Sequence, residues 1–302
     1  GWGRTPHGAA MKVQAMATAG ILDRLSKGVL IADGAMGTML ETAGMKPGAC
    51  PELWNVENAS AVADIHRGYA DAGAGVVLTN TFGGSRPKLE RYGLGERVVE
   101  INAAAVALAR AIDGPFVAAS IGPTGKLLEP YGEATVDELA AAFSEQIEAC
   151  AAADIIWIET MTDVGEARAA VDAAKRATDL PIALTFTYDS TPSGPRTMMG
   201  VTPEAAAEEF DDVAILGVNC GTVEVCLATL QAYREAGAEM SFVARANAGL
   251  PKWEHGRTVF PEGPEAYAES SRPLAEVAGV IGGCCGTTPS HIAEVATAVG
   301  GA

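Results

Sequence analysis

Residues 279–285 read GVIGGCC, a short apolar stretch that ends in glycines and two adjacent cysteines. Seven comparable stretches rich in β-branched residues precede it, and runs of this length are typical of strands buried on both faces. They are residues 29–34, 75–80, 116–122, 155–160, 182–188, 214–220 and 241–248. Alanine-rich stretches with helical spacing separate them, including residues 59–73, 136–153 and 223–237. This regular alternation of strand and helix predicts an α/β fold, a single (β/α)8 TIM barrel.

A doubly wound open sheet is the alternative that fits the same alternation. That fold usually carries a G-x-G-x-x-G fingerprint after its first strand, and this chain contains no such sequence. Because the composition shows no break, residues 11–302 are expected to form one barrel domain. Residues 1–10, GWGRTPHGAA, precede Met11 without hydrophobic periodicity, and we expect a vector-derived remnant or an unstructured start.

Three helix starts are predicted from their capping residues. Thr135 is followed three positions later by Glu138, which is the spacing of a capping box. Thr202 and Thr288 each stand directly before a proline, and a cap residue followed by proline is typical of a first helical turn.

The chain of 302 residues carries 21 basic and 38 acidic residues, which gives a formal net charge of −17. This excess argues against nucleic acid or an anionic membrane surface as a partner, because both are themselves negatively charged. No apolar run reaches the roughly 18 residues that suggest a transmembrane helix, and no secretory leader is recognised. We therefore expect a soluble cytoplasmic protein without nucleic-acid or membrane partners. The sequence leaves the oligomeric state open, a homo-oligomer included.

The six cysteines are too sparse in a chain of this length for a disulfide framework, so reduced thiols or metal ligands are expected. They are Cys50, Cys150, Cys220, Cys226, Cys284 and Cys285. A bridge between the adjacent Cys284 and Cys285 would close a strained small ring. Cys150 and Cys226 lie on helical stretches, where packing is the expected role.

Polar residues gather where the predicted strands end, and the chemistry of such barrels lies at the carboxyl ends of the strands. These residues are Asp33, Asn80, Glu159, Cys220, Asn247, Cys284 and Cys285. Cys220 ends the sixth strand and the adjacent pair ends the eighth. Three sulfurs are therefore expected to converge over the barrel mouth.

Successive side chains on a strand point to opposite faces, so Cys284 and Cys285 can share a target only where the backbone turns. Gly282, Gly283 and Gly286 supply the freedom for such a turn. Three thiolates with one open position match a catalytic zinc site rather than a closed structural one. Zinc in such a site favours binding and deprotonation of a substrate thiol near pH 7, which predicts methylation of a thiolate by in-line displacement.

Eight motifs together resemble the homocysteine S-methyltransferase family, and the resemblance runs from about Val29 to Ala293. The motifs are DGAMGTML (33–40), TNTFGGSRPKL (79–89), IGPTGKLLEPYG (121–132), IET (158–160), RTMMGVTPE (196–204), GVNC (217–220), NAGLPK (247–252) and GGCCGTTPSHI (282–292). The family includes betaine–homocysteine methyltransferases and the homocysteine-binding module of cobalamin-dependent methionine synthase. The resemblance implies a zinc-dependent TIM barrel that methylates zinc-bound homocysteine thiolate to methionine, with Cys220, Cys284 and Cys285 as the zinc ligands.

The resemblance further implies that Asp33 and Glu159 bind the amino acid, with Glu159 pairing with its ammonium group. A zwitterion needs a carboxylate for its ammonium and N–H donors for its own carboxylate, so these roles are chemically reasonable. Thr81 and Asn80 are expected at the same mouth, Asn80 either as a brace for a loop or as a contact to the substrate. Asn247 resembles the position that can occupy the open zinc site before the substrate arrives.

The methyl donor is left open between alternatives. Glycine betaine carries a cationic quaternary ammonium group, which favours aromatic walls. The loop residues Trp54 and Trp253 would provide such walls unless they simply pack against neighbours. The chain has no D-x-H-x-x-G corrinoid signature, so it would use a small donor directly or meet a separate methyl-corrinoid protein as a homocysteine-activating subunit. A further interpretation is a redox or metalloid-binding protein that uses the vicinal pair alone and has no need of Cys220.

Overall fold

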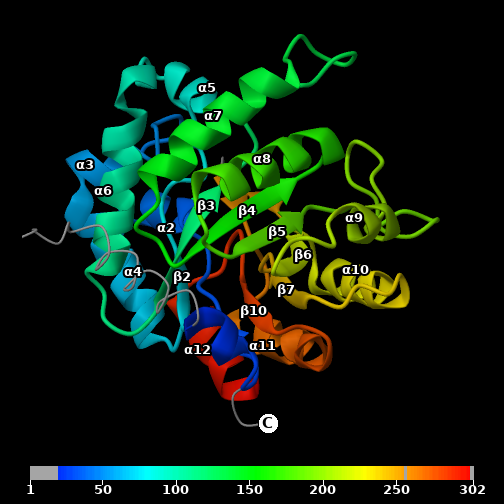
Figure 1. Ribbon diagram of the computed structural model, residues 1–302. Coiled ribbons are helices and arrows are strands. Elements are labelled where there is room, and N and C mark those ends of the chain that lie inside the picture. Colours follow the sequence, from blue (N-terminus) through cyan, green and yellow to red (C-terminus); the bar gives the residue numbers. More distant parts are fainter. Residues whose placement is uncertain (1–19, 255–256, 300–302) are drawn as a thin grey trace, which may run out of the picture.

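The computed structural model describes residues 20–254 and 257–299, so the predicted start at residues 1–10 lies outside the described residues. Eight strands form one sheet in the order β1-β10-β7-β6-β5-β4-β3-β2, and each neighbouring pair is parallel. A parallel bridge between Ala32 and Val76 joins the two end strands, so the sheet closes on itself (Figure 1). The barrel strands are β1 (Leu30–Ile31), β2 (Val76–Leu78), β3 (Phe116–Ile121), β4 (Ile155–Met161), β5 (Ile182–Phe186), β6 (Ile215–Asn219), β7 (Ser241–Ala246) and β10 (Val280–Gly283). The prediction of a single (β/α)8 barrel is confirmed.

Helices surround the barrel and cover its outer face (Figure 1). They are α2 (Gly37–Thr42), α3 (Trp54–Glu57), α4 (Ala59–Asp71), α5 (Arg86–Glu90), α6 (Val98–Arg110), α7 (Val136–Ala149), α8 (Val164–Ala177), α9 (Pro203–Glu209), α10 (Val223–Glu235), α11 (Pro264–Ser271) and α12 (Pro289–Val299), with short 3₁₀ turns η1 (Gly95–Arg97) and η2 (Arg272–Glu276). The three helical stretches quoted from the sequence correspond to α4, α7 and α10.

The helix starts follow local capping chemistry. Thr135 and Glu138 form the predicted capping box at the start of α7, and the Thr202 side chain accepts the N–H of the third residue of α9. At α12 the acceptor is the side chain of the third helical residue, because the backbone N–H of Thr288 donates to Nδ1 of His291 at 3.2 Å. The proline after Thr288 still begins the helix as predicted.

Side chains on the strands alternate between the barrel lumen and the helices. On β4, Trp157 packs in an apolar cluster formed almost entirely by strand residues, whereas its neighbour Ile156 packs against the helices. Val243 on β7 belongs to the same lumen cluster. The next inward positions, two residues further along these strands, are Glu159 and Arg245. Polar groups therefore lie directly above an apolar plug that fills the lower lumen.

A second small sheet lies in the connection between β7 and α11. Its antiparallel strands are β8 (Lys252–Glu254) and β9 (Arg257–Val259). This hairpin was not predicted from the sequence, because each strand has only three residues and those of β8 are all exposed, so there is no apolar run. Trp253 lies on β8 with 76% of its surface exposed.

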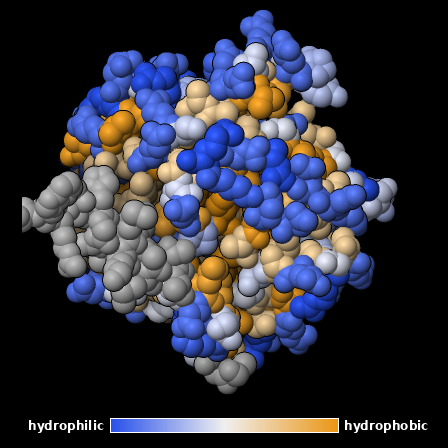
Figure 2. All heavy atoms as spheres, in the orientation of Figure 1, coloured by the Kyte–Doolittle hydropathy of each residue, from blue (hydrophilic) through white to orange (hydrophobic). Residues whose placement is uncertain are grey.

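Hydrophilic residues cover much of the face in Figure 2, with apolar residues between them. Within the described part of the chain, no helix is both long and apolar enough to cross a bilayer.

Gly217 on β6 allows a close approach to β7. It pairs in register with Val243, and a Cβ at position 217 would lie 2.1 Å from the Val243 carbonyl oxygen. We expect Gly217→Ala to lower the free energy of unfolding by about 1–3 kcal/mol, the usual cost of overpacking, in a urea titration. Gly279→Ala is the matched control, since its Cβ would meet no atom closer than 3.7 Å. Equal stability of the two variants would contradict this packing.

Candidate active site

Three cysteine sulfurs lie together at the carboxyl rim of the barrel. Cys220 directly follows β6, Cys284 and Cys285 directly follow β10, and β7 lies between those two strands. The Sγ atoms of Cys220 and Cys285 are 3.9 Å apart, and all three sulfurs lie within 4.8 Å of one another. None of them forms a disulfide. The structure thus brings together the three sulfurs that the sequence places on separate strands.

The backbone around the cluster is held by Asn247, which directly follows the intervening strand β7. Its Nδ2 donates to the carbonyl of Cys220 at 3.0 Å, and its Oδ1 accepts the N–H of Cys285 at 3.0 Å. Cys220 itself has a φ of 65°, which is uncommon for a residue other than glycine. Asn247 therefore braces both cysteine loops, and a role of its side chain toward metal or substrate stays a prediction.

Two glycines let the adjacent cysteines approach a common point. A Cβ at Gly283 would lie 2.2 Å from Oγ1 of Thr287, so no side chain fits there. Gly286 has a φ of 80°, and the chain turns at this residue. Cys284 and Cys285 accordingly both contribute to the cluster rather than pointing to opposite faces.

The three thiols share their protons through hydrogen bonds. Bonds with Cys284 and Cys285 lower the pKa of the Cys220 thiol well below its ordinary value, whereas the bond with Cys220 raises the pKa of Cys285. Cys220 is therefore the thiol of this cluster whose ionised form the other two thiols favour. A cation bound among the sulfurs would release further protons, because metal ligands must be thiolates.

The cluster borders a cavity of about 450 Å³ in the barrel mouth. Its lining includes Asp33, Ser120, Glu159, Arg245 and the three cysteines, together with apolar side chains from the loops after β1 and β2. Met36 and Phe82 are among these apolar groups. A thiol end and a charged end are therefore present in one cavity.

The charged end is an ion-pair network across the lumen. Arg245 reaches Glu159 with Nη1 at 3.1 Å and Asp33 with Nη2 at 3.0 Å. Ser120 donates its hydroxyl to the other oxygen of Glu159, and the N–H of Leu78 donates to the other oxygen of Asp33. Every oxygen of the two carboxylates thus has a protein donor, and each has the lone pairs to accept a second hydrogen bond.

Burial opposes the charge on both carboxylates. Removal from water raises the pKa of Asp33 to about 7, although the Arg245 guanidinium acts in the opposite direction. Burial likewise raises the pKa of Glu159, again against the effect of Arg245. An additional cation at these oxygens would favour their ionised forms.

Four of the predicted site residues do not line the cavity. Thr81 is buried, and its hydroxyl donates to the carbonyl of Ser120. Asn247 is bonded to the backbone of Cys220 and Cys285. Trp54 is half-buried on α3 and packs against the main hydrophobic core, and Trp253 lies exposed on the β8–β9 hairpin.

Asn80 does line the cavity, but its amide is engaged by neighbouring loops. Nδ2 donates to the carbonyl of Pro51 at 2.8 Å and to Oδ1 of Asn55 at 3.0 Å. Of its two expected roles, this geometry favours the brace for a loop.

Sequence reasoning missed Arg245 and Asn219. A charged residue in the middle of the apolar stretch SFVARANA was the available signal for Arg245. Asn219 stands directly before Cys220, and its Oδ1 accepts from the N–H of Thr160 at 2.9 Å and from Oγ1 of Thr185 at 2.7 Å. Thr160 follows Glu159 and has a φ of 64°, so Asn219 holds an unusual backbone conformation beside a site carboxylate.

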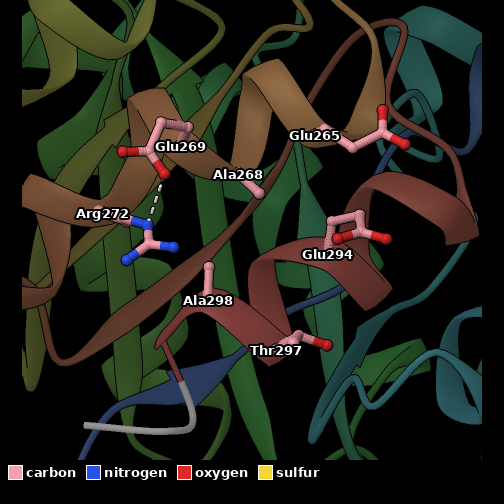
Figure 3. Close-up of a pocket in the computed structure, with 7 residues that line it drawn as sticks. All are labelled: Glu265, Ala268, Glu269, Arg272, Glu294, Thr297 and Ala298. Carbon is pink, nitrogen blue, oxygen red and sulfur yellow. Dashed lines mark ion pairs between the residues drawn. The ribbon is translucent and has the colours of Figure 1, made fainter.

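A second hollow lies outside the barrel between α11 and α12 (Figure 3). Glu265, Glu269 and Glu294 border it, and Arg272 pairs with Glu269 at 2.7 Å. Because both partners of this ion pair are largely exposed and no thiol lines the hollow, the chemistry is assigned to the barrel mouth.

Comparison with known proteins gives a consistent relationship. A family model described as homocysteine S-methyltransferase matches residues 30–299. A methionine synthase of Mycobacterium tuberculosis (strain ATCC 25618 / H37Rv) is 30% identical over 304 residues, covering 92% of this chain and 25% of that protein. A methionine synthase of Mycobacterium leprae (strain TN) is 29% identical over 306 residues with the same coverage. The chain thus spans about a quarter of the length of these curated relatives.

Solved structures of the homocysteine methyltransferase MmuM from Escherichia coli share the fold. The metallated form has a TM-score of 0.74 and 24% identity, covering 93% of this chain and 99% of that chain. The oxidised form has a TM-score of 0.71 and 25% identity, covering 89% of this chain and 95% of that chain. The barrel therefore matches along nearly its whole length.

Replacement of Asn219 tests the support of the site. Asn219→Ala removes the acceptor of the Thr185 hydroxyl and leaves the N–H of Thr160 only the longer contact of 3.4 Å to Oγ1 of Thr185. We therefore expect the free energy of unfolding to fall by about 1–3 kcal/mol in a denaturant titration. Thr229→Val is the control, because the buried Thr229 hydroxyl has no hydrogen-bond partner in the described structure. A stable Asn219→Ala variant would show that Thr160 keeps its conformation without this bond.

Proposed function

The chain belongs to the homocysteine S-methyltransferase family and is a methyltransferase, and from that membership we propose that it methylates the thiol of homocysteine to give methionine. The observation that carries the proposal is the cluster of Cys220, Cys284 and Cys285 beside Asp33 and Glu159 in one cavity. A thiol would bind at the sulfur cluster and an ammonium group at the carboxylates. The cavity thus offers complementary groups for both ends of homocysteine.

The donor set fits zinc. Thiolates are ligands that zinc favours, and a tetrahedral site with bonds of about 2.3 Å has edges of about 3.8 Å between sulfurs. The distance of 3.9 Å between the sulfurs of Cys220 and Cys285 agrees with such an edge. Bound there, zinc would supply a Lewis acid that lowers the pKa of an incoming thiol, so that the thiolate is present near pH 7.

The residues of the chain bind and orient the substrate. Glu159 and Asp33 accept N–H bonds from the ammonium group, while Ser120 keeps one oxygen of Glu159 in place. In the transfer step a sulfur lone pair forms the bond to the methyl carbon as the bond from that carbon to the donor breaks. The electron pair leaves with the donor's heteroatom, so this step needs no general base.

The cavity offers contacts for the quaternary ammonium group of a small donor such as glycine betaine. The carboxylates of Glu41 and Glu52 line its walls, and Phe82 supplies an aromatic face. A quaternary ammonium is attracted both by carboxylates and by an aromatic ring. Phe82 takes the role that the sequence analysis gave to Trp54 and Trp253.

A separate methyl-corrinoid protein is the second candidate donor. The similarity to two methionine synthases, of which the chain spans about a quarter, favours this alternative. Exposed apolar side chains on loops that follow barrel strands offer contacts for such a partner: Tyr131, Met198 and Trp253 are 75%, 77% and 76% exposed. In this case the chain would activate homocysteine without a donor site of its own.

A donor assay tests the proposal and separates the candidates. Zinc-loaded protein is incubated with homocysteine and, separately, glycine betaine, S-methylmethionine or a methyl-corrinoid protein, and methionine is measured by mass spectrometry. We expect methionine with betaine or S-methylmethionine. Product with the methyl-corrinoid protein alone would support the second candidate, and no product with any donor would overturn the proposed function.

Loss of one cysteine tests the metal site. Cys284→Ser replaces a thiolate by a hydroxyl that stays protonated at neutral pH, so we expect loss of bound zinc and of turnover. Metal content is measured by inductively coupled plasma mass spectrometry. Cys226→Ala is the control, because this fully buried cysteine lies in the core and should leave zinc content unchanged. Full zinc and activity in Cys284→Ser would contradict the ligand assignment.

A further inference from the structure

Arg245 is a buried cation at the floor of the substrate cavity. Only 4% of its surface is exposed, and its guanidinium spans the lumen from β7 to Asp33 and Glu159. Its Nη2 also donates to the carbonyl of Gly34 at 3.3 Å. Strands β1 and β4 are therefore connected through a single side chain of β7.

The walls of the cavity are otherwise acidic. Carboxylates of Asp33, Glu41, Glu52 and Glu159 line it, whereas Arg245 is the only basic residue among the described residues of the lining. An amino acid brings its own carboxylate into this space. Coulomb repulsion between that carboxylate and the acidic lining weakens binding unless a positive charge nearby offsets it.

A simple amine would meet no such repulsion. It carries the ammonium that Asp33 and Glu159 attract, but it lacks the second, negative charge. Without a cation in the lining, the cavity would favour the amine over the amino acid. The site therefore needs a positive charge to prefer a zwitterion.

We propose that Arg245 is the residue that determines this specificity, by offsetting part of the acidic lining so that the cavity accepts a zwitterionic thiol rather than a simple aminothiol. The inference deepens the proposed function and rests on it. Arg245 acts through the charge and placement of Asp33 and Glu159, to which it is bonded. It is a specificity residue and takes no part in bond making or breaking.

An arginine with only a structural role would affect stability but not the choice of ligand. Arg110 also caps a buried carboxylate, since its Nη1 donates to Oδ2 of Asp154 at 2.7 Å and the Asp154 side chain is only 3% exposed. This pair lies at the start of β4, at the opposite end of the barrel from the cavity. Loss of Arg110 should cost stability without affecting the choice of ligand.

The test compares two ligands on the zinc-loaded protein by isothermal titration calorimetry. The ligands are L-homocysteine and homocysteamine, the aminothiol that remains when the carboxylate of homocysteine is removed. The ratio of the two dissociation constants is the readout, because a general loss of folding or of zinc affects both ligands alike. Zinc content is measured for every variant.

We expect the wild-type protein to prefer L-homocysteine. Arg245→Met should shift the ratio of the two dissociation constants in favour of homocysteamine by about tenfold or more. The reason is that a unit charge is removed from a cavity in which water screens charges less than in bulk solvent. Arg245→Lys keeps the charge and should largely retain the wild-type ratio. The double variant with Arg245→Met and Asp33→Asn removes one charge of each sign and should regain much of it.

Arg110→Met is the matched control and should leave the ratio unchanged. An unchanged ratio in Arg245→Met, or a shift as large in Arg245→Lys, would overturn the inference. If Arg245→Met does not fold, Arg245→Lys and the double variant still test the inference, because each must keep most of the wild-type preference for L-homocysteine. Failure of the proposed function can be told apart from failure of this inference. If the proposed function is wrong, the wild-type protein itself shows no preference for L-homocysteine over homocysteamine.

Discussion

The site depends on the parallel alignment of three neighbouring strands, β6, β7 and β10. Because parallel strands end at the same rim, residues that follow β6 and β10 meet across the width of one intervening strand. Asn247 after β7 spans that gap with one amide, donating to the loop of Cys220 and accepting from the loop of Cys285. The hydrogen bonds of the Asn247 side chain to the backbone of both loops therefore help to set the spacing of the sulfurs.

A second constraint comes from charge inside the barrel. Trp157 and its apolar neighbours fill the lower lumen, so the carboxylate of Glu159 lies above a layer of apolar side chains. An unpaired buried carboxylate is costly, and Arg245 compensates for the charges of both Glu159 and Asp33. The same arrangement leaves one ionic end and one sulfur end in a single cavity, which is the arrangement that a thiol amino acid requires.

The architecture could be predicted from the sequence because each barrel strand is a short apolar run and because helices such as α4, α7 and α10 show helical spacing between these runs. The positions of Cys220, Cys284 and Cys285 at strand ends followed from the same pattern. Arg245 was missed because its partners Asp33 and Glu159 lie 212 and 86 residues away, and no local pattern reports such pairs. Trp54 and Trp253 were considered for the donor site because loop residues cannot be placed from sequence. Their packing and exposure depend on the paths of the α3 segment and of the β8–β9 hairpin, which short-range periodicity does not encode.

The most direct test is X-ray absorption spectroscopy at the zinc edge of the purified protein, recorded with and without homocysteine. If Cys220, Cys284 and Cys285 form one metal site with an open position, the spectrum shows three sulfur neighbours without the substrate and four with it. Two or fewer sulfurs in the free protein, or a sulfur count that homocysteine leaves unchanged, would contradict the assignment of this cluster as the thiol-binding centre.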